Sequence, residues 1–159
     1  MWLKIHTVHW VIFDGEVESV EIPTKVWILS ILPHHNPLTS ISLPGLVKFF
    51  PVEKRESKVL SDSQFLFEDE KIAIAVGKGI IYTDGNNVVM FVASATVTPT
   101  SDEESLQKMK QDLEEKISQI RASGNQEEME KAYLNLQKLT ADLKLLKIKK
   151  HNHKNQSSQ

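Results

Sequence analysis

Residues 98–104, Thr98-Pro99-Thr100-Ser101-Asp102-Glu103-Glu104, separate two parts of the chain that differ in composition. All six prolines lie at or before this stretch, and ten of the eleven aromatic residues precede residue 92. After it, the chain is rich in Leu, Lys, Glu, Gln and Ala, which are good helix formers. The last nine residues contain no apolar side chain, which is typical of a disordered tail. The expected parts are a domain at 1–99, a domain at 100–150 and a disordered tail at 151–159.

The first part has the pattern of an all-β domain, with short β-branched and aromatic runs separated by turn residues. Asp14-Gly15 and Asp84-Gly85 each stand between two such runs and predict tight hairpin turns, because glycine accepts a positive φ. Further turns are expected at residues 33–37, at Pro44-Gly45 and at residues 77–79. Roughly eight to ten short strands are expected, which favours a β-sandwich or flattened barrel.

One expected strand, Val88-Val89-Met90-Phe91-Val92, is apolar at every position. A strand with one face in water alternates apolar and polar residues. We therefore expect this strand either deep in the sandwich or at an interface.

The second part predicts an antiparallel pair of helices. Ser101 and Glu104 have the spacing of a capping box, and Gly124 can end the first helix as its C′ residue. Asn125 is expected to cap the second helix. Each helix has an apolar stripe at steps of three and four residues. The two stripes are Leu106, Met109, Leu113, Ile117 and Ile120, and Met129, Ala132, Leu136, Leu139, Leu143 and Leu146.

A two-helix hairpin has little core of its own, so it is expected to dock on the sandwich, to dock on a partner, or to alternate between them. The predicted fold class is therefore mainly β plus α: an N-terminal β-sandwich followed by a C-terminal antiparallel helical hairpin.

The composition argues against several classes of function. The absence of cysteine excludes disulfides, thiolate zinc sites, iron–sulfur clusters and cysteine nucleophiles. Lys and Arg number 19 and Asp and Glu 21, and a formal charge of −2 argues against a general nucleic-acid binder. No signal peptide is predicted at the start of the sequence. The longest uncharged run, residues 26–47, contains three prolines, so we expect a soluble chain.

No catalytic or metal-binding set of residues is predicted. His34-His35 and the pairs His6/His9 and His151/His153 do not supply three or four ligands at one place. Residues 77–79 are glycine-rich but lack the Lys-Ser/Thr ending of a phosphate-binding loop. A small metal enzyme that uses the histidine-rich loop is therefore the weakest hypothesis, and we expect a non-catalytic protein.

Four segments, in this order along the chain, together resemble one known family. They are residues 13–24, Phe-Asp-Gly-Glu-Val-Glu-Ser-Val-Glu-Ile-Pro-Thr; residues 31–38, Ile-Leu-Pro-His-His-Asn-Pro-Leu; Pro44-Gly45; and residues 77–95. They resemble the epsilon subunit of bacterial-type rotary ATP synthases, whose loop reads Gly-Ile-Leu-Pro-Gly-His-Ala-Pro-Leu at the place of residues 30–38. The likeness spans nearly the whole chain.

The sequence also departs from this family. Ser30 and His34 replace two loop glycines, Trp27 stands in a segment that contains Gly-Glu in the family, and Ala93 replaces an aspartate. Some members bind ATP on the hairpin through an Asp-x-x-Arg-Ala motif. Residues 102–106 lack its arginine, so no cofactor is expected.

The resemblance implies a central-stalk (rotor) subunit, peripheral to the cytoplasmic face of the bacterial cell membrane. Such a subunit couples proton-driven rotation of the c ring to ATP synthesis in the alpha/beta head, and it contacts the gamma subunit. The implied contact with the c ring comprises Ile31, Leu32, Pro33, His35, Pro37 and Leu38.

The family's hairpin can restrain ATP hydrolysis, and the candidate contacts with the head are Lys108, Lys110 and Arg121. The residues alone leave a second interpretation open, in which the sandwich and a coiled-coil hairpin form a free-standing adaptor of another assembly.

Overall fold

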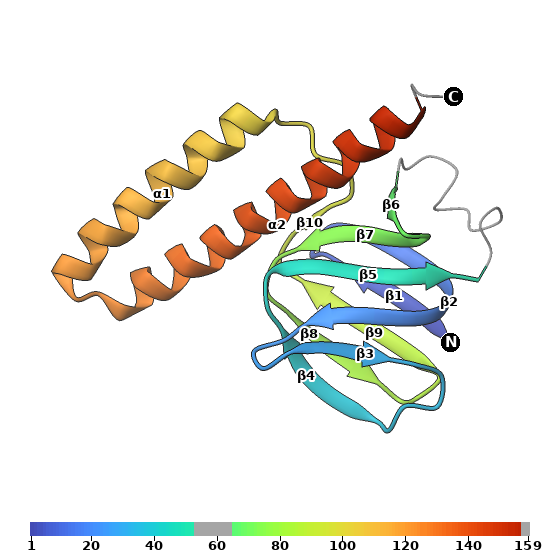
Figure 1. The fold of residues 1–159 in the computed structure, drawn as a ribbon. Coiled ribbons are helices and arrows are strands. Elements are labelled where there is room, and N and C mark those ends of the chain that lie inside the picture. Colours follow the sequence, from blue (N-terminus) through green and yellow to red (C-terminus); the bar gives the residue numbers. More distant parts are fainter. Residues whose placement is uncertain (53–64, 157–159) are drawn as a thin grey trace.

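The computed structural model of the chain describes residues 1–52 and 65–156, with side chains through Lys154. The described residues form ten strands followed by two helices, as Figure 1 shows, and the predicted sandwich and hairpin are confirmed. The elements are β1 (Trp2–His6), β2 (Val11–Pro23), β3 (Ile28–Ile31), β4 (Leu38–Ser42), β5 (Gly45–Pro51), β6 (Leu66–Glu68), β7 (Lys71–Val76), β8 (Gly79–Thr83), β9 (Asn87–Val92), β10 (Ala95–Thr96), α1 (Glu103–Ser123) and α2 (Gln126–Gln156).

The strands form two packed layers that share β2. Sheet A has the order β2-β1-β9-β8-β4, and sheet B has the order β10-β7-β5-β2-β3, with β6 also paired to β7. β2 pairs with β1 along residues 11–16 and with β5 and β3 along residues 17–23. The same strand therefore contributes its first half to sheet A and its second half to sheet B.

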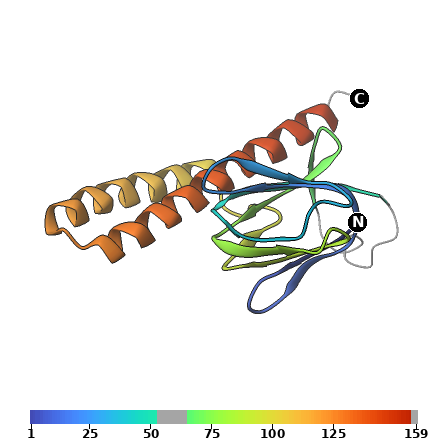
Figure 2. The ribbon, with the colours of Figure 1, turned by 90° about the horizontal axis from the view of Figure 1, so that it is seen from below.

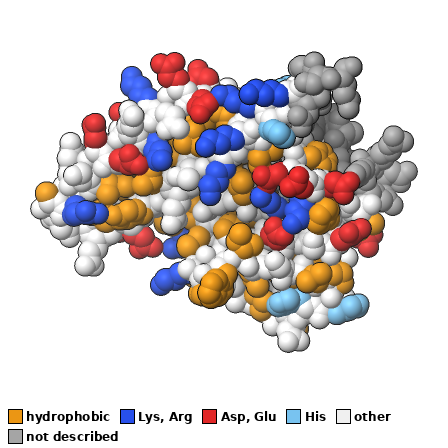
Figure 3. Space-filling model, viewed as in Figure 1, with side chains coloured by type: hydrophobic (Ala, Val, Ile, Leu, Met, Phe, Trp, Pro, Cys, Tyr) orange, Lys and Arg blue, Asp and Glu red, His pale blue; other side chains and the backbone are white. Residues whose placement is uncertain are grey.

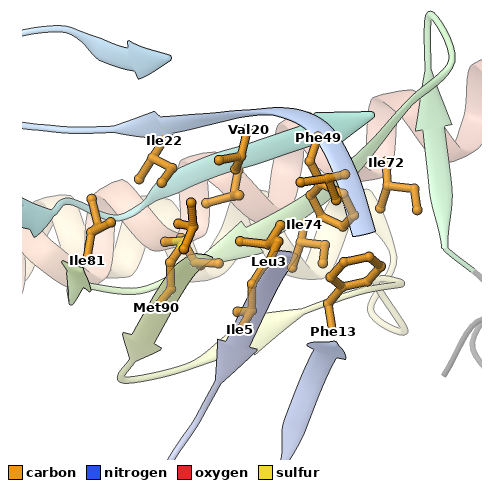
Figure 4. Packing of buried hydrophobic residues seen from close by; sticks show 14 of the residues in the cluster. Leu3, Ile5, Phe13, Val20, Ile22, Phe49, Ile72, Ile74, Ile81 and Met90 are labelled. Carbon is orange, nitrogen blue, oxygen red and sulfur yellow. The ribbon is translucent and has the colours of Figure 1, made fainter. Parts of the chain in front are cut away.

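The core lies between the two sheets and consists of side chains from the inner face of each strand. Figure 4 shows Leu3, Ile5 and Met90 of sheet A directed toward residues of sheet B, such as Ile74. The Phe13 and Phe49 rings lie with their centroids 4.4 Å apart. This packing follows the period-two alternation of the strands.

The hairpin turn predicted at Asp14-Gly15 is wrong. β2 runs through both residues, and Gly15 is buried opposite Leu3 of β1. The turn lies earlier, where Thr7 Oγ1 accepts hydrogen bonds from the backbone N–H groups of His9 and Trp10. Glycine inside a strand often marks a bend or bulge, and here it stands just before β2 passes from sheet A to sheet B.

The other predicted turns are confirmed. Gly85 has a φ of 97° between β8 and β9, and the Asp84 carboxylate accepts hydrogen bonds from the backbone N–H groups of Asn86 and Asn87. The turns near residues 33–37, Pro44 and residues 77–78 connect β3 to β4, β4 to β5 and β7 to β8.

The two helices are antiparallel and meet along the predicted stripes, except that Met109 is exposed. The N-cap of α1 is Asp102, which accepts a hydrogen bond from the Ser105 N–H, whereas Ser101 was expected. Both residues can cap a helix, and a shift of one residue decides between them. Gly124 ends α1 with a φ of 72°, as predicted.

The hairpin docks on the outer face of sheet B through α2. Ala141, Leu145 and Ile148 of α2 pack on Ala73 and Ala75 of β7. Figure 2 shows α1 lying beside α2, with the closed end of the hairpin extending past the sandwich. Apart from the chain connection at residues 97–102, α1 packs on α2.

Residues 151–156 belong to α2, so the tail predicted at 151–159 is wrong over these six positions. Polar composition alone suggested disorder, but the helix continues past the sandwich face on which Ile148 is buried. The Asn152 side-chain amide also donates a hydrogen bond to the Phe67 carbonyl oxygen, at 2.9 Å. Residues 157–159 lie outside the described part of the chain.

Candidate functional site

The outer face of sheet A carries a row of large apolar side chains from neighbouring strands. Across the sheet, Ile41 of β4 pairs with Ile80 of β8, and Ile80 pairs with Phe91 of β9. Phe91 in turn pairs with His6 of β1. Ile41 is 54% exposed, Ile80 56% and Phe91 59%. The His6 ring stacks on the Phe91 ring, with 5.2 Å between their centroids. This row is continuous across four strands, and its three apolar members are each more than half exposed.

A second row beside the first adds Tyr82 and Val89, and then Lys4 and Asp14. Tyr82 is half exposed and Val89 is half-buried. We refer to Ile41, Ile80, Tyr82, Val89 and Phe91 together as the apolar face. The all-apolar strand therefore has one face in the core and one in solvent, because Val88, Met90 and Val92 are buried while Phe91 remains in water.

The charges at the border of the apolar face are paired with each other. Lys4 Nζ lies 2.9 Å from Asp14 Oδ2, and Trp2 Nε1 donates to Asp14 Oδ1 at 2.6 Å. Burial raises the pKa of Asp14, but the hydrogen bonds from Lys4 and Trp2 and the Lys4 charge outweigh it, so the pKa is lowered. Asp14 therefore stays ionised and paired, which leaves the adjoining face apolar. A contiguous exposed apolar area of this kind is typical of a protein interaction site.

The loop predicted to contact the c ring lies at the end of the sandwich, against the Asp84–Asn87 turn. The His34 N–H donates to the Gly85 carbonyl oxygen at 2.8 Å, and His34 itself has a φ of 67°. The loop thus keeps a positive φ at a position where the family has glycine, although such a φ is uncommon for other residues.

The six predicted loop residues do not form one exposed surface. Ile31 is fully buried in the core, so it belongs to the sandwich and not to a contact surface. Its inward direction follows from the alternation along β3, which the loop motif alone did not reveal. The exposed members are Leu32, Pro33 and Pro37, and the half-buried members are His35 and Leu38.

The three predicted head contacts lie on α1 but are not brought together. Lys108 is exposed and Lys110 lies 4.0 Å from Glu114, one turn further along. Arg121 Nη2 donates to the Tyr133 hydroxyl at 3.0 Å, at the other end of the helix. A rise of about 1.5 Å per residue separates Arg121 from the two lysines by roughly 17–20 Å. They mark two places on the hairpin.

The described residues contain neither a cluster of metal ligands nor a membrane-spanning helix. No three of their His, Asp and Glu side chains come close enough together to hold a metal ion. Neither α1 nor α2 combines the length and the apolar composition that a membrane-spanning helix requires.

Comparisons with known proteins give a likeness in fold. No protein-family model matches the chain, and no curated protein matches it in sequence. The chain is similar to one chain of the mitochondrial ATP synthase of Euglena gracilis, in a cryo-EM structure of its OSCP, F1 and c-ring in rotational state 1. The alignment has a TM-score of 0.62 at 16% identity and covers 87% of this chain and 76% of the other. The two chains therefore share a fold.

A second chain comes from the central stalk and c-ring of the Tetrahymena thermophila mitochondrial ATP synthase. It aligns with a TM-score of 0.46 at 17% identity, over 60% of this chain and 65% of the other.

Proposed function

We propose that this chain is a non-catalytic central-stalk subunit of a rotary ATP synthase of the bacterial type. The observation that carries the proposal is the fold shared with a chain of the Euglena ATP synthase. Because the alignment covers 87% of 159 residues, it extends beyond the sandwich into the helices. Motifs in the same order as in the epsilon family give independent support.

The apolar face supports the proposal because a rotor subunit needs a large contact with its neighbour in the stalk. Ile41, Ile80, Tyr82 and Phe91 would be buried by a partner with a complementary apolar surface. We propose that this partner is the gamma subunit. The exposed loop residues Leu32 and Pro33, at the end of the sandwich, are proposed to contact the c ring.

In this arrangement the chain connects the c ring, driven by protons, to the rotation that produces ATP in the alpha/beta head. The chain itself supplies no catalytic group, and we propose no nucleotide cofactor because residues 102–106 lack the arginine of the family's ATP motif. As a bacterial-type subunit it would be held at the cytoplasmic face of the membrane by its partners.

Affinity purification from native membranes tests the proposal. The tag belongs at the C-terminus, because the Met1 amino group donates to the Val17 carbonyl oxygen at 3.2 Å. The wild-type chain is expected to recover gamma, alpha, beta and c subunits. Phe91→Lys is expected to lose them, because a lysine would be buried without a partner in the interface.

Met109→Lys is the matched control, since Met109 is 52% exposed and lines a groove between α1 and α2, not the apolar face of sheet A. It should recover the same subunits as the wild-type chain. Capture of an intact ATP synthase that lacks this chain would refute the proposal and leave the adaptor interpretation.

We also propose that the hairpin restrains ATP hydrolysis through basic residues. Replacing Lys108, Lys110 and Arg121 together by Glu should raise the ATP hydrolysis rate of the assembled enzyme, because charge attraction to an acidic surface would become repulsion. Lys131→Glu, another exposed position on the hairpin, is the control. Deletion of residues 101–159 should raise the rate as well, and an unchanged rate in both cases would exclude the inhibitory role.

A further inference from the structure

β3 and β4 are the terminal strands of the two sheets, and they lie on the same side of the sandwich. Among the described strands, β3 pairs only with β2, and β4 pairs only with β8. Figure 1 shows both at the lower edge of the sandwich. A single Thr24–Ser42 bridge and a hydrogen bond from the Leu43 N–H to the Pro23 carbonyl oxygen connect the layers at one end. Between these contacts and the loop at residues 32–37, the side of the sandwich is open.

Neither edge carries the usual protection against pairing with another chain. Edge strands in soluble proteins commonly contain Lys, an inward-pointing charge or a proline. The sequences Ile28-Leu29-Ser30-Ile31 and Leu38-Thr39-Ser40-Ile41-Ser42 contain none of these, and residues 26–47 contain no charge at all. Figure 3 shows hydrophobic, histidine and uncharged polar side chains at this lower edge, whereas charged side chains of both signs cover the helices.

A groove of about 390 Å³ lies between the two edges. Trp27, Ile28, Leu29 and Leu38 give it apolar walls, and Ser30 and Ser40 contribute hydroxyl groups. Ile28 is 65% exposed and Trp27 is 79% exposed, so they are available to cover an entering side chain. The volume of the groove is enough for one or two side chains, and its walls contain no charged residue. The groove therefore suits apolar side chains.

We propose that an extended, uncharged segment of the partner that covers the apolar face adds to the edge of β4 as a further strand of sheet A. This inference rests on the proposed function only in assigning that partner to the central stalk. In a terminal strand, every second residue directs its N–H and C=O groups away from the sheet, and another strand satisfies them. The added strand would place alternate side chains over the groove and beside Ile41.

The edge of β4 is favoured over that of β3 because it continues the apolar face. Ile41 is a member of that face and lies on β4 itself. A partner seated on Ile80 and Phe91 therefore reaches the β4 edge without a gap. β3 belongs to sheet B, whose outer face α2 already covers over β5, β6 and β7 within this chain.

Hydrogen exchange of the full-length chain, measured free and in the complex purified from native membranes, tests the proposal. Peptides that cover Leu38–Ser42 should exchange about tenfold more slowly in the complex, because their solvent-facing amides become paired. β10 is the matched control, since Ala95 and Thr96 form the terminal strand of sheet B at the end opposite β3. Exchange at β10 should be unchanged.

A charge variant gives a second readout. Ser40→Lys should reduce recovery of the partner, because the lysine would enter an apolar groove, and Ser118→Lys on the exposed side of α1 should not. One outcome would overturn the strand addition alone: the β4 amides exchange as fast in the complex as in the free chain, while Phe91→Lys still disrupts the complex. The proposed function would then remain intact. If β4 instead becomes more protected as the concentration of the free chain rises, a second copy of this chain binds the β4 edge. This outcome would also overturn the proposal.

Discussion

The two outer faces of the sandwich differ in the size of their side chains and in what covers them. Sheet B presents Ala73 and Ala75, whose small side chains allow α2 to lie close to the strands. Sheet A presents Ile80, Tyr82 and Phe91, which no described element covers. Small residues thus mark the face that the chain covers itself, and large exposed residues mark the face that is available to another molecule.

The largest expected effect comes from the interface of α2 with sheet B. Leu145 is fully buried there, so Leu145→Ala should lower the free energy of unfolding by about 2–5 kcal/mol. Ile80→Ala on the apolar face should cost less than about 1 kcal/mol, because half of that side chain is already in water. Denaturant unfolding of both variants measures the difference. If Leu145→Ala and Ile80→Ala lowered the free energy of unfolding equally, the two faces would not differ in burial as described.

A smaller effect is expected from adding volume under the helix. Ala75→Leu should lower the free energy of unfolding by about 1–3 kcal/mol, because it pushes α2 away from β7. Tyr82→Trp, an enlargement on the apolar face, has room in solvent and should change the free energy of unfolding by less than about 0.5 kcal/mol. Amide exchange in α2 gives a second readout, which should quicken in the first variant only.

The smallest effect concerns the attachment of α1. The hydrogen bond and charge of Lys150 lower the pKa of Glu103 from its ordinary value of 4.5. A lowered folded pKa adds stability above the unfolded pKa, and this stability is lost as the pH falls through the folded value. The protection of amides at the start of α1, relative to their intrinsic exchange rate at each pH, should therefore fall below about pH 4.5.

Glu103→Gln should reduce this pH dependence to the part that comes from the Asp102 cap, because the hydrogen bond from the Ser105 N–H also lowers the pKa of Asp102. The exposed Glu115→Gln should leave the full pH dependence in place. A pH dependence that is undiminished in Glu103→Gln would show that the Glu103–Lys150 pair does not hold the end of α1.

The seam of the helical hairpin could be predicted from the sequence, but its docking on sheet B was not. The apolar residues at steps of three and four located the contacts between α1 and α2. A second stripe, Ala141, Leu145 and Ile148, has steps of four and three and faces sheet B. This stripe was visible in the sequence, yet it merges with the first one in a helix that is apolar on two sides.

The candidate surface was predicted less well than the fold. The motif at residues 31–38 indicated a contact loop, but the motif does not show which residues point inward, and Ile31 is buried. The apolar face needs the strand register, because Ile41, Ile80 and Phe91 are distant in sequence. The Asp14-Gly15 pair failed as a turn signal because Gly15 has a place inside a strand.

The sharing of β2 by both sheets has a mechanical consequence. Its 13 residues carry hydrogen-bond ladders to β1 in sheet A and to β5 in sheet B. A load applied to the apolar face therefore passes along one continuous backbone to the sheet on which α2 rests, and the densely packed core between them resists compression. The two layers are expected to turn together as a stiff body and to fail together when β2 is pulled out of register.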